Sequence, residues 1–182
     1  MAIDPDDLKN VRMPLFSWDY EDCTEPEHWF LHARGYLDCS KFLFEQMAEE
    51  RFDRSFHRAK AAVFLFEHAL ELFFKGAIAQ AGGQIQPSHD LAHLYAEFRK
   101  KYPGKQFEFH GDIHCAVSKD SGVPQTAFPR YPSDRTGAPW PGHRHIDIAI
   151  WCTQVLLFSE DLARIQKYIK SRYPGARQDG RA

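Results

Sequence analysis

The sequence has no apolar run long enough to cross a lipid bilayer. A membrane-spanning helix needs about 20 consecutive apolar residues. The most apolar stretch, residues 59–81, is interrupted by Glu67, His68, Glu71 and Lys75. The first ten residues are acidic and lack the basic and then apolar pattern of a secretory signal. We therefore expect a cytoplasmic protein with no membrane partner.

Cysteine is also scarce, which argues against a disulfide framework and a structural zinc site. The chain has four cysteines among its 182 residues, and none forms a CxxC pair. With no secretory signal, they read as free thiols in a reducing compartment. Histidine pairs spaced by four residues occur at His28/His32, His89/His93 and His110/His114, but ten histidines make such pairs common by chance. We expect no metal ion and no cofactor.

Positive charge is in short supply as well. Lysine and arginine number 23 against 25 acidic residues, which gives a formal net charge of −2. Proteins that hold nucleic acid by non-specific electrostatics are usually strongly basic, so a nucleic-acid role needs a local basic patch. The densest cationic run consists of Arg130, Arg135, His143, Arg144 and His145, and the aromatic residues Tyr131 and Trp140 lie between them. Arginine and aromatic side chains together suit phosphate pairing and base stacking, although a plain Pro-rich surface loop explains the run equally well.

Four segments carry apolar residues at helical spacing. They span residues 24–50, 53–81, 89–101 and 143–172. Thr24 and Glu27 fit a capping box at the first start, and Ser88 fits an N-cap at the third. Gly82 and Gly83 predict the end of the second. With few strand signals and 15 phenylalanines, the sequence predicts an all-α bundle with a Phe-rich core.

The length predicts a single domain at residues 24–173, between an N-terminal arm (1–23) and a polar tail (174–182). Residues 104–142 have no helical period and hold five of the eleven prolines, with Pro103 at their edge. We expect a long Pro-rich loop or hairpin insertion before the last helix. Phe107 and Phe109 alternate with polar neighbours, which favours a short strand there.

Three phrases occur in a characteristic order. They are the apolar stretch from Ala61 to Ala77, the phrase Ser88-His-Asp-Leu91, and the phrase Arg130-Tyr-Pro132. Together they resemble the HEPN domains (higher eukaryotes and prokaryotes nucleotide-binding) over roughly residues 26–172. The resemblance implies an antiparallel bundle of four or five helices that often forms a homodimer. It also implies either a metal-independent RNA-cleaving enzyme of toxin–antitoxin or defence systems, or a nucleotide-binding module that partners a nucleotidyltransferase.

Two sets of residues are candidates for the site. The resemblance implies that a ribonuclease member carries an Arg followed, after four to six residues, by a His. Arginine stabilises the phosphorane charge, and histidine transfers protons. Near the start of the last helix, where the family motif normally lies, the nearest candidates are Arg135 and His143, with seven residues between them. Arg51 and His57 fit the spacing, but they lie at the junction of the first two helices. Separately, Glu71 and Lys75 have the i,i+4 order that favours pairing. They form either a salt bridge at the edge of the buried face or one wall of a polar groove that faces Arg130.

Three functional hypotheses follow. The first is a HEPN-like nucleotide- or RNA-phosphate-binding or partner module, in which the ligand contacts Glu71, Lys75, Arg130, Tyr131, Arg144 and His145. The alternative is a metal-independent endoribonuclease that uses Arg135 and His143 as its catalytic pair. The second alternative is a protein-interaction domain with no small ligand.

Overall fold

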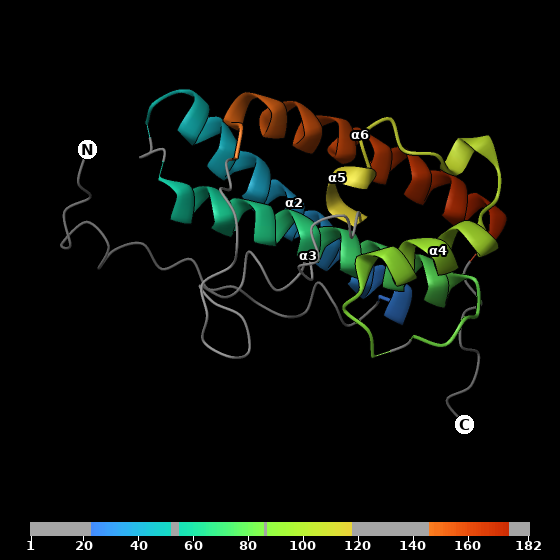
Figure 1. Cartoon of the computed structure of the whole chain (residues 1–182). Coiled ribbons are helices and arrows are strands. Elements are labelled where there is room, and N and C mark those ends of the chain that lie inside the picture. The colour runs from blue at the N-terminus through green and yellow to red at the C-terminus, as the bar shows by residue number, and fades with distance from the viewer. Residues whose placement is uncertain (1–22, 52–54, 86, 118–145, 175–182) are drawn as a thin grey trace.

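The computed structural model describes residues 23–51, 55–85, 87–117 and 146–174, and these are helical with no strand among them (Figure 1). The elements in chain order are α2 (Glu25–Ala48), α3 (Phe56–Gln80), α4 (Leu91–Lys101), the 3-10 helix η2 (Lys105–Phe107), the single turn α5 (His114–Val117) and α6 (Ile148–Arg172). The all-α class predicted from the sequence is confirmed for this part of the chain.

The three long helices lie side by side, and α4 packs against α3 (Figure 1). Contacts at both ends show that α2 and α6 are antiparallel. Lys170, near the end of α6, lies 3.2 Å from Glu27 at the start of α2. At the opposite end, the Cys152 thiol lies 3.4 Å from the carbonyl oxygen of Phe44. Helix α3 is likewise antiparallel to α2. The Ser40 hydroxyl donates to the carbonyl of Ala62 at 2.8 Å, and nearer the start of α2 the ring centres of Phe30 and Phe73 lie 5.4 Å apart.

The first backbone N–H groups of a helix have no partner within the helix, and side chains at its start accept hydrogen bonds from them. At the start of α2, the backbone N–H of Thr24 donates to the Glu27 carboxylate at 3.0 Å, as the capping-box prediction requires. The Ser88 prediction is wrong. Helix α4 is capped by Asp90, whose carboxylate accepts the N–H groups of Ala92 and His93 at 3.0 and 3.2 Å. Ser88 instead accepts a hydrogen bond from the N–H of Asp90, because the aspartate two residues later caps the helix.

The predicted glycine end of α3 is confirmed. Gly82 has φ of +68°, a left-handed conformation that glycine adopts at little cost. The N–H of Gly82 donates to Ala79 at 2.8 Å, and that of Gly83 donates to Ile78 at 2.9 Å. These bonds use carbonyl groups that the helix would otherwise leave without partners, and they turn the chain toward α4.

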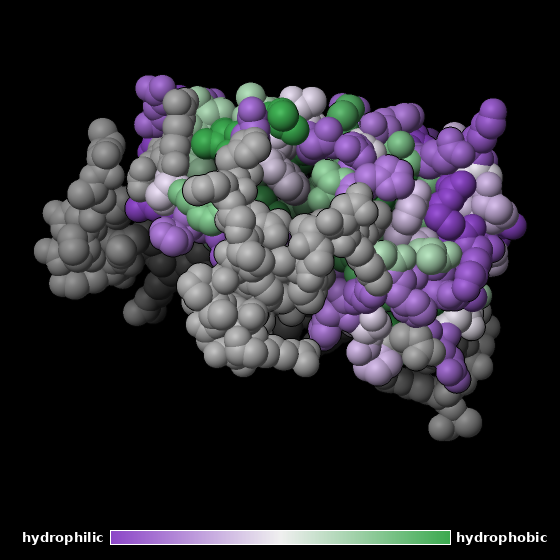
Figure 2. Space-filling model, viewed as in Figure 1, coloured by the Kyte–Doolittle hydropathy of each residue, from purple (hydrophilic) through white to green (hydrophobic). Residues whose placement is uncertain are grey.

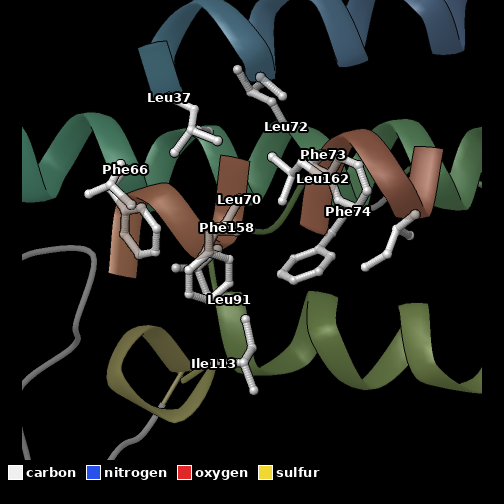
Figure 3. Packing of buried hydrophobic residues seen from close by; sticks show 14 of the residues in the cluster. Leu37, Phe66, Leu70, Leu72, Phe73, Phe74, Leu91, Ile113, Phe158 and Leu162 are labelled. Carbon is white, nitrogen blue, oxygen red and sulfur yellow. The ribbon is translucent and has the colours of Figure 1, made fainter. Parts of the chain in front are cut away.

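The core is rich in phenylalanine, as predicted. Figure 3 shows side chains from α2, α3, α4 and α6 pointing into one shared interior. Phe66 and Phe158 meet edge to face with ring centres 4.9 Å apart and an interplanar angle of 78°. Such ring pairs add about 0.5–1.5 kcal/mol beyond the area they bury. The fully buried large side chains are Phe44, Phe66, Phe73, Phe74, Phe98, Tyr102, Phe107 and Phe158.

The strand predicted around Phe107 and Phe109 is wrong. The described residues that follow α4 form η2, a bend and α5, and their backbone groups bond to α6 instead of a neighbouring strand. The buried carboxylate of Asp161 accepts the N–H groups of His110 and Gly111 at 2.6 and 3.0 Å. Arg164 donates to the carbonyl oxygens of residues 106 and 108. Residues 118–142 of the predicted insertion, the arm before Cys23 and the tail after Pro174 lie outside the described residues.

Among the described residues, no helix has the length and apolar character needed to cross a membrane.

Candidate functional site

A stripe of polar residues runs along the otherwise apolar helix α3. Glu67, His68, Glu71 and Lys75 are spaced by one, three and four residues, so they lie toward one side of the helix. Glu67, Glu71 and Lys75 are buried, with 5%, 2% and 6% of their surface exposed. Burying a charged group is costly unless it is paired, so this stripe needs partners.

Glu71 is the centre of a buried ionic cluster. Its Oε1 accepts a hydrogen bond from the Lys75 ammonium at 2.8 Å, and Nδ1 of His89 lies 2.9 Å from the same oxygen. Nδ1 of His68 approaches the other oxygen, Oε2, at 3.7 Å. The predicted Glu71–Lys75 pair is therefore confirmed. His89 precedes α4, so one carboxylate connects α3 to the segment that begins α4. We call Glu71, Lys75, His68 and His89 the Glu71 cluster.

The cluster keeps Glu71 ionised. Burial by itself raises the pKa of this carboxyl group, but the opposing effects are larger. The nearby imidazole of His68, the hydrogen bonds of Lys75 and His89, and the charge of Lys75 together lower the pKa of Glu71 from 4.5 to about 2. The carboxylate is therefore negatively charged across the neutral range, and it balances the buried ammonium of Lys75.

On one side of the cluster lies a pocket between α3 and α4, with a volume of about 550 Å³. Lys75 from α3 and His93, Glu97 and Lys101 from successive turns of α4 line this α3–α4 pocket. Gly83 forms part of its wall, and a Cβ atom there would lie 2.7 Å from Cε of Lys101. The absence of a side chain at Gly83 thus leaves room for the Lys101 stem beside the pocket.

On the other side lies a groove between α2 and α3, with a volume of about 640 Å³. One face of α2 supplies Glu25, His28, Trp29, His32 and Tyr36, and α3 supplies His68 and Leu72. The rings of Tyr36 and His68 meet edge to face, with centroids 4.5 Å apart. The Lys75 ammonium lies 5.9 Å from the centre of the Trp29 ring, so Lys75 is next to both the α2–α3 groove and the α3–α4 pocket.

Gly76 allows Trp29 to approach α3. A Cβ atom on Gly76 would lie 2.9 Å from Cβ of Trp29 and 3.3 Å from the ring of Phe30. These atoms belong to the beginning of a packed helix and cannot swing away as a flexible side-chain end can. The glycine therefore sets how closely α2 lies against α3 beside the groove.

Two of the eight candidate residues from the sequence, Glu71 and Lys75, lie in the described part of the chain. The others, Arg130, Tyr131, Arg135, His143, Arg144 and His145, lie outside it. The catalytic pair and the cationic run accordingly stay predictions, as does the groove wall facing Arg130. Within the described ranges, no three His, Cys, Asp or Glu side chains are grouped so that they could hold a metal ion.

Neither the α3–α4 pocket nor the α2–α3 groove was predicted from the sequence. His93, Glu97 and Lys101 repeat at four-residue steps, and so do His28, His32 and Tyr36, which is the signal for one face of a helix. The periodicity indicates that these residues share one face of a helix. It does not indicate which helix lies opposite that face, and the pocket and the groove are each lined by two helices.

Comparison with known proteins adds no relative. No protein-family model matches the chain, and no curated protein or solved structure matches it either. The features of this chain that bear on its function are therefore the Glu71 cluster, the α3–α4 pocket and the α2–α3 groove.

Proposed function

We propose that this chain is a HEPN-like module that binds a nucleotide or an RNA phosphate, and that the phosphate binds in the α3–α4 pocket. The supporting observation is the convergence of Lys75, Lys101 and His93 on that pocket. Phosphate oxygens bind best where charged N–H donors approach from several sides. The pocket contains one of the ligand residues expected from the sequence, Lys75.

Lys75 has the capacity to bind a ligand while it stays paired. An ammonium group has three protons to donate. Within the described residues, Glu71 is its one hydrogen-bond acceptor, so two protons remain for a phosphate oxygen. Glu97 adds a negative charge to the same wall, but its carboxylate accepts a hydrogen bond from Lys100 that partly offsets it. Protonation of His93 strengthens the pocket for anions.

The test compares two lysines by calorimetric titration with inorganic pyrophosphate and with ADP. Lys101 lines the pocket, whereas Lys167 is exposed on α6 outside it. We expect Lys101→Ala to weaken binding about tenfold, the size of one charge-assisted hydrogen bond, and Lys167→Ala to have little effect. Equal losses in both variants, or no binding of either anion to the folded protein, would contradict the phosphate site.

We also propose that two copies of the chain associate through the exposed face of α2. Leu31 and Phe42 are 45% and 58% exposed on this helix. Gly35 lies between them, and a Cβ atom there would meet nothing within 4 Å. Glycine inside a helix costs about 0.5–1 kcal/mol relative to alanine, and no packing contact among the described residues explains it. The close approach of a second helix backbone at Gly35 accounts for a glycine at this position.

The face is self-complementary, as a two-fold dimer requires. An antiparallel approach centred near residues 36 and 37 brings Leu31 of one copy opposite Phe42 of the partner subunit. The same symmetry brings Arg34 beside Asp38 of the partner subunit, and both side chains are exposed. Figure 2 shows further apolar surface along the first half of α6, where Ile150 is 58% exposed, while the end that carries α4 is mostly hydrophilic. The resemblance adds a nucleotidyltransferase as a second partner protein for such a module.

A further inference from the structure

The α2–α3 groove has a chemistry that a phosphate site does not use. Its walls are ring systems and imidazoles, contributed by Trp29, Tyr36, His68, His28 and His32. Among the described residues, no lysine or arginine lines it. The Lys75 ammonium lies 5.9 Å from the centre of the Trp29 ring, and the Glu71 carboxylate balances its charge. The groove therefore favours an uncharged planar ring over a free anion.

Ring stacking supplies the affinity for such a ligand. Aromatic side chains stack on nucleobases because every base has a flat π face, and each stacked base contributes enough to change affinity severalfold. Trp29 and Tyr36 are partly buried, so they present rings whose positions are already fixed by packing. Trp29 is held against α3 at Gly76, and Tyr36 is held edge-on against His68. A ligand does not have to order these side chains when it binds.

The Glu71 cluster selects the kind of ring. Nδ1 of His68 is buried and lies 3.7 Å from the ionised Oε2 of Glu71. The negative charge favours the tautomer whose proton is on Nδ1, which leaves Nε2 as a hydrogen-bond acceptor. Glu25, at the edge of the groove, is an acceptor too when ionised. Two acceptors beside a stacking surface require a ring that carries an N–H donor group.

We propose that the α2–α3 groove binds an amino-bearing nucleobase, as found in adenine, cytosine or guanine. The base stacks on Trp29 and Tyr36, and its amino group donates to His68. Glu71 is a positioning residue here, because it acts through the tautomer of His68. This base site is separate from the phosphate site of the α3–α4 pocket, although both lie next to Lys75.

The test uses a nucleoside, which has a base and no phosphate. Adenosine is titrated into the full chain by calorimetry, beside purine riboside, which has the same rings without the amino group. We expect adenosine to bind, and we expect purine riboside to bind about tenfold more weakly because the acceptors lose their partner. Equal affinity for the two nucleosides would overturn the amino-group assignment.

Substitutions in the α2–α3 groove test whether adenosine binds there. Trp29→Ala and His68→Ala are each expected to weaken adenosine binding about tenfold, and Tyr168→Ala, an exposed aromatic on α6 outside the groove, is the control. His32→Ala changes the groove without removing a core side chain, so it keeps the test informative if Trp29→Ala fails to fold. Perturbation of the His32 and His68 ring signals by adenosine in NMR spectra of the wild-type protein supports the groove.

Unchanged adenosine affinity in all groove variants, or no binding of adenosine at millimolar concentration, would overturn the base site. The phosphate proposal is tested separately, because pyrophosphate has no base and is expected to depend on Lys101. A protein that binds pyrophosphate but not adenosine thus disproves the groove proposal alone.

Discussion

Nδ1 of His89 lies 2.9 Å from Oε1 of Glu71, and this contact joins the segment before α4 to the middle of α3. His89 belongs to the phrase Ser88-His-Asp-Leu91, and Glu71 belongs to the apolar stretch that ends at Ala77. Two of the three sequence phrases that carry the family resemblance are therefore in direct contact. The contact also holds α4, with His93 and Lys101, beside Lys75.

The pKa of Glu71 predicts a loss of stability in acid. A carboxyl group whose folded pKa is lowered to about 2 from 4.5 contributes stability that is fully present above pH 4.5 and is lost as the pH falls toward 2. The difference corresponds to about 3 kcal/mol. We expect Glu71→Gln to remove most of this pH dependence and to destabilise the protein at pH 7. Urea unfolding at several pH values measures both effects.

The control for that experiment is Glu49→Gln, which removes a carboxylate that is 52% exposed at the end of α2. We expect this variant to have nearly the stability of the wild type at pH 7. If Glu71→Gln and Glu49→Gln show the same dependence on pH, the buried cluster is not the source of the acid sensitivity.

Two glycines of the long helices are expected to respond in opposite ways to alanine. Gly76→Ala puts a methyl group 2.9 Å from Cβ of Trp29, so α2 and α3 must separate. Overpacking of this kind costs about 1–3 kcal/mol in the free energy of unfolding. Gly35→Ala meets no neighbouring atom within the chain, and it is expected to stabilise the isolated subunit by about 0.5–1 kcal/mol. Urea unfolding at low protein concentration distinguishes them, and equal effects would contradict the packing described for Gly76.

The dimer proposal makes a specific crosslinking prediction. The two-fold arrangement places residue 31 of one copy opposite residue 42 of the partner subunit, and both positions are exposed. We expect the Leu31→Cys/Phe42→Cys double variant, in a Cys39→Ser background, to form a disulfide-linked dimer under mild oxidation. Leu31→Cys alone in the same background lacks the second member of each pair and is expected to stay monomeric. A double variant that also stays monomeric under oxidation contradicts the α2 interface.

A further prediction concerns Asp161, which is fully buried on α6. Its carboxylate accepts the N–H groups of His110 and Gly111 and pairs with Arg164 at 2.7 Å. Asp161→Asn keeps the shape but removes the charge that balances Arg164, and we expect a loss of about 3 kcal/mol. Amide hydrogen exchange of residues 110 and 111 measures the release of this segment from α6. Unchanged exchange at both amides would show that the carboxylate does not hold it.

The sequence predicted those parts of the structure that depend on near neighbours. The periodicity of apolar residues located the long helices, the four-residue spacing identified the Glu71–Lys75 pair, and Gly82 marked the end of α3. The segment of residues 105–111 could not be predicted in this way. Its backbone groups bond to Asp161 and Arg164, and the bond from Gly111 spans 50 residues of sequence. Local patterns carry no signal for such partners.

The candidate site likewise contains features that depend on near neighbours in the sequence and features that depend on distant residues. The sequence predicted Lys75 as a ligand residue because it interrupts an apolar helix face. It gave no reason to group Lys75 with Lys101 or with Trp29, because those contacts depend on how α2 and α4 lie against α3. His89 was interpreted as a residue of the helix start, and its bond to Glu71 becomes visible only when α4 is placed beside α3.

Titration of ADP into the isotope-labelled chain, followed by residue-resolved NMR, tests the nucleotide-binding proposal most directly. We expect the backbone amides of Gly83, Gln84, His93 and Lys101, which surround the α3–α4 pocket, to shift in a saturable manner. We expect Lys101→Ala to weaken that response and Lys167→Ala, on the exposed surface of α6, to preserve it. If these amides do not move at saturating ADP, or if their shifts survive unchanged in Lys101→Ala, the α3–α4 pocket is not a phosphate site.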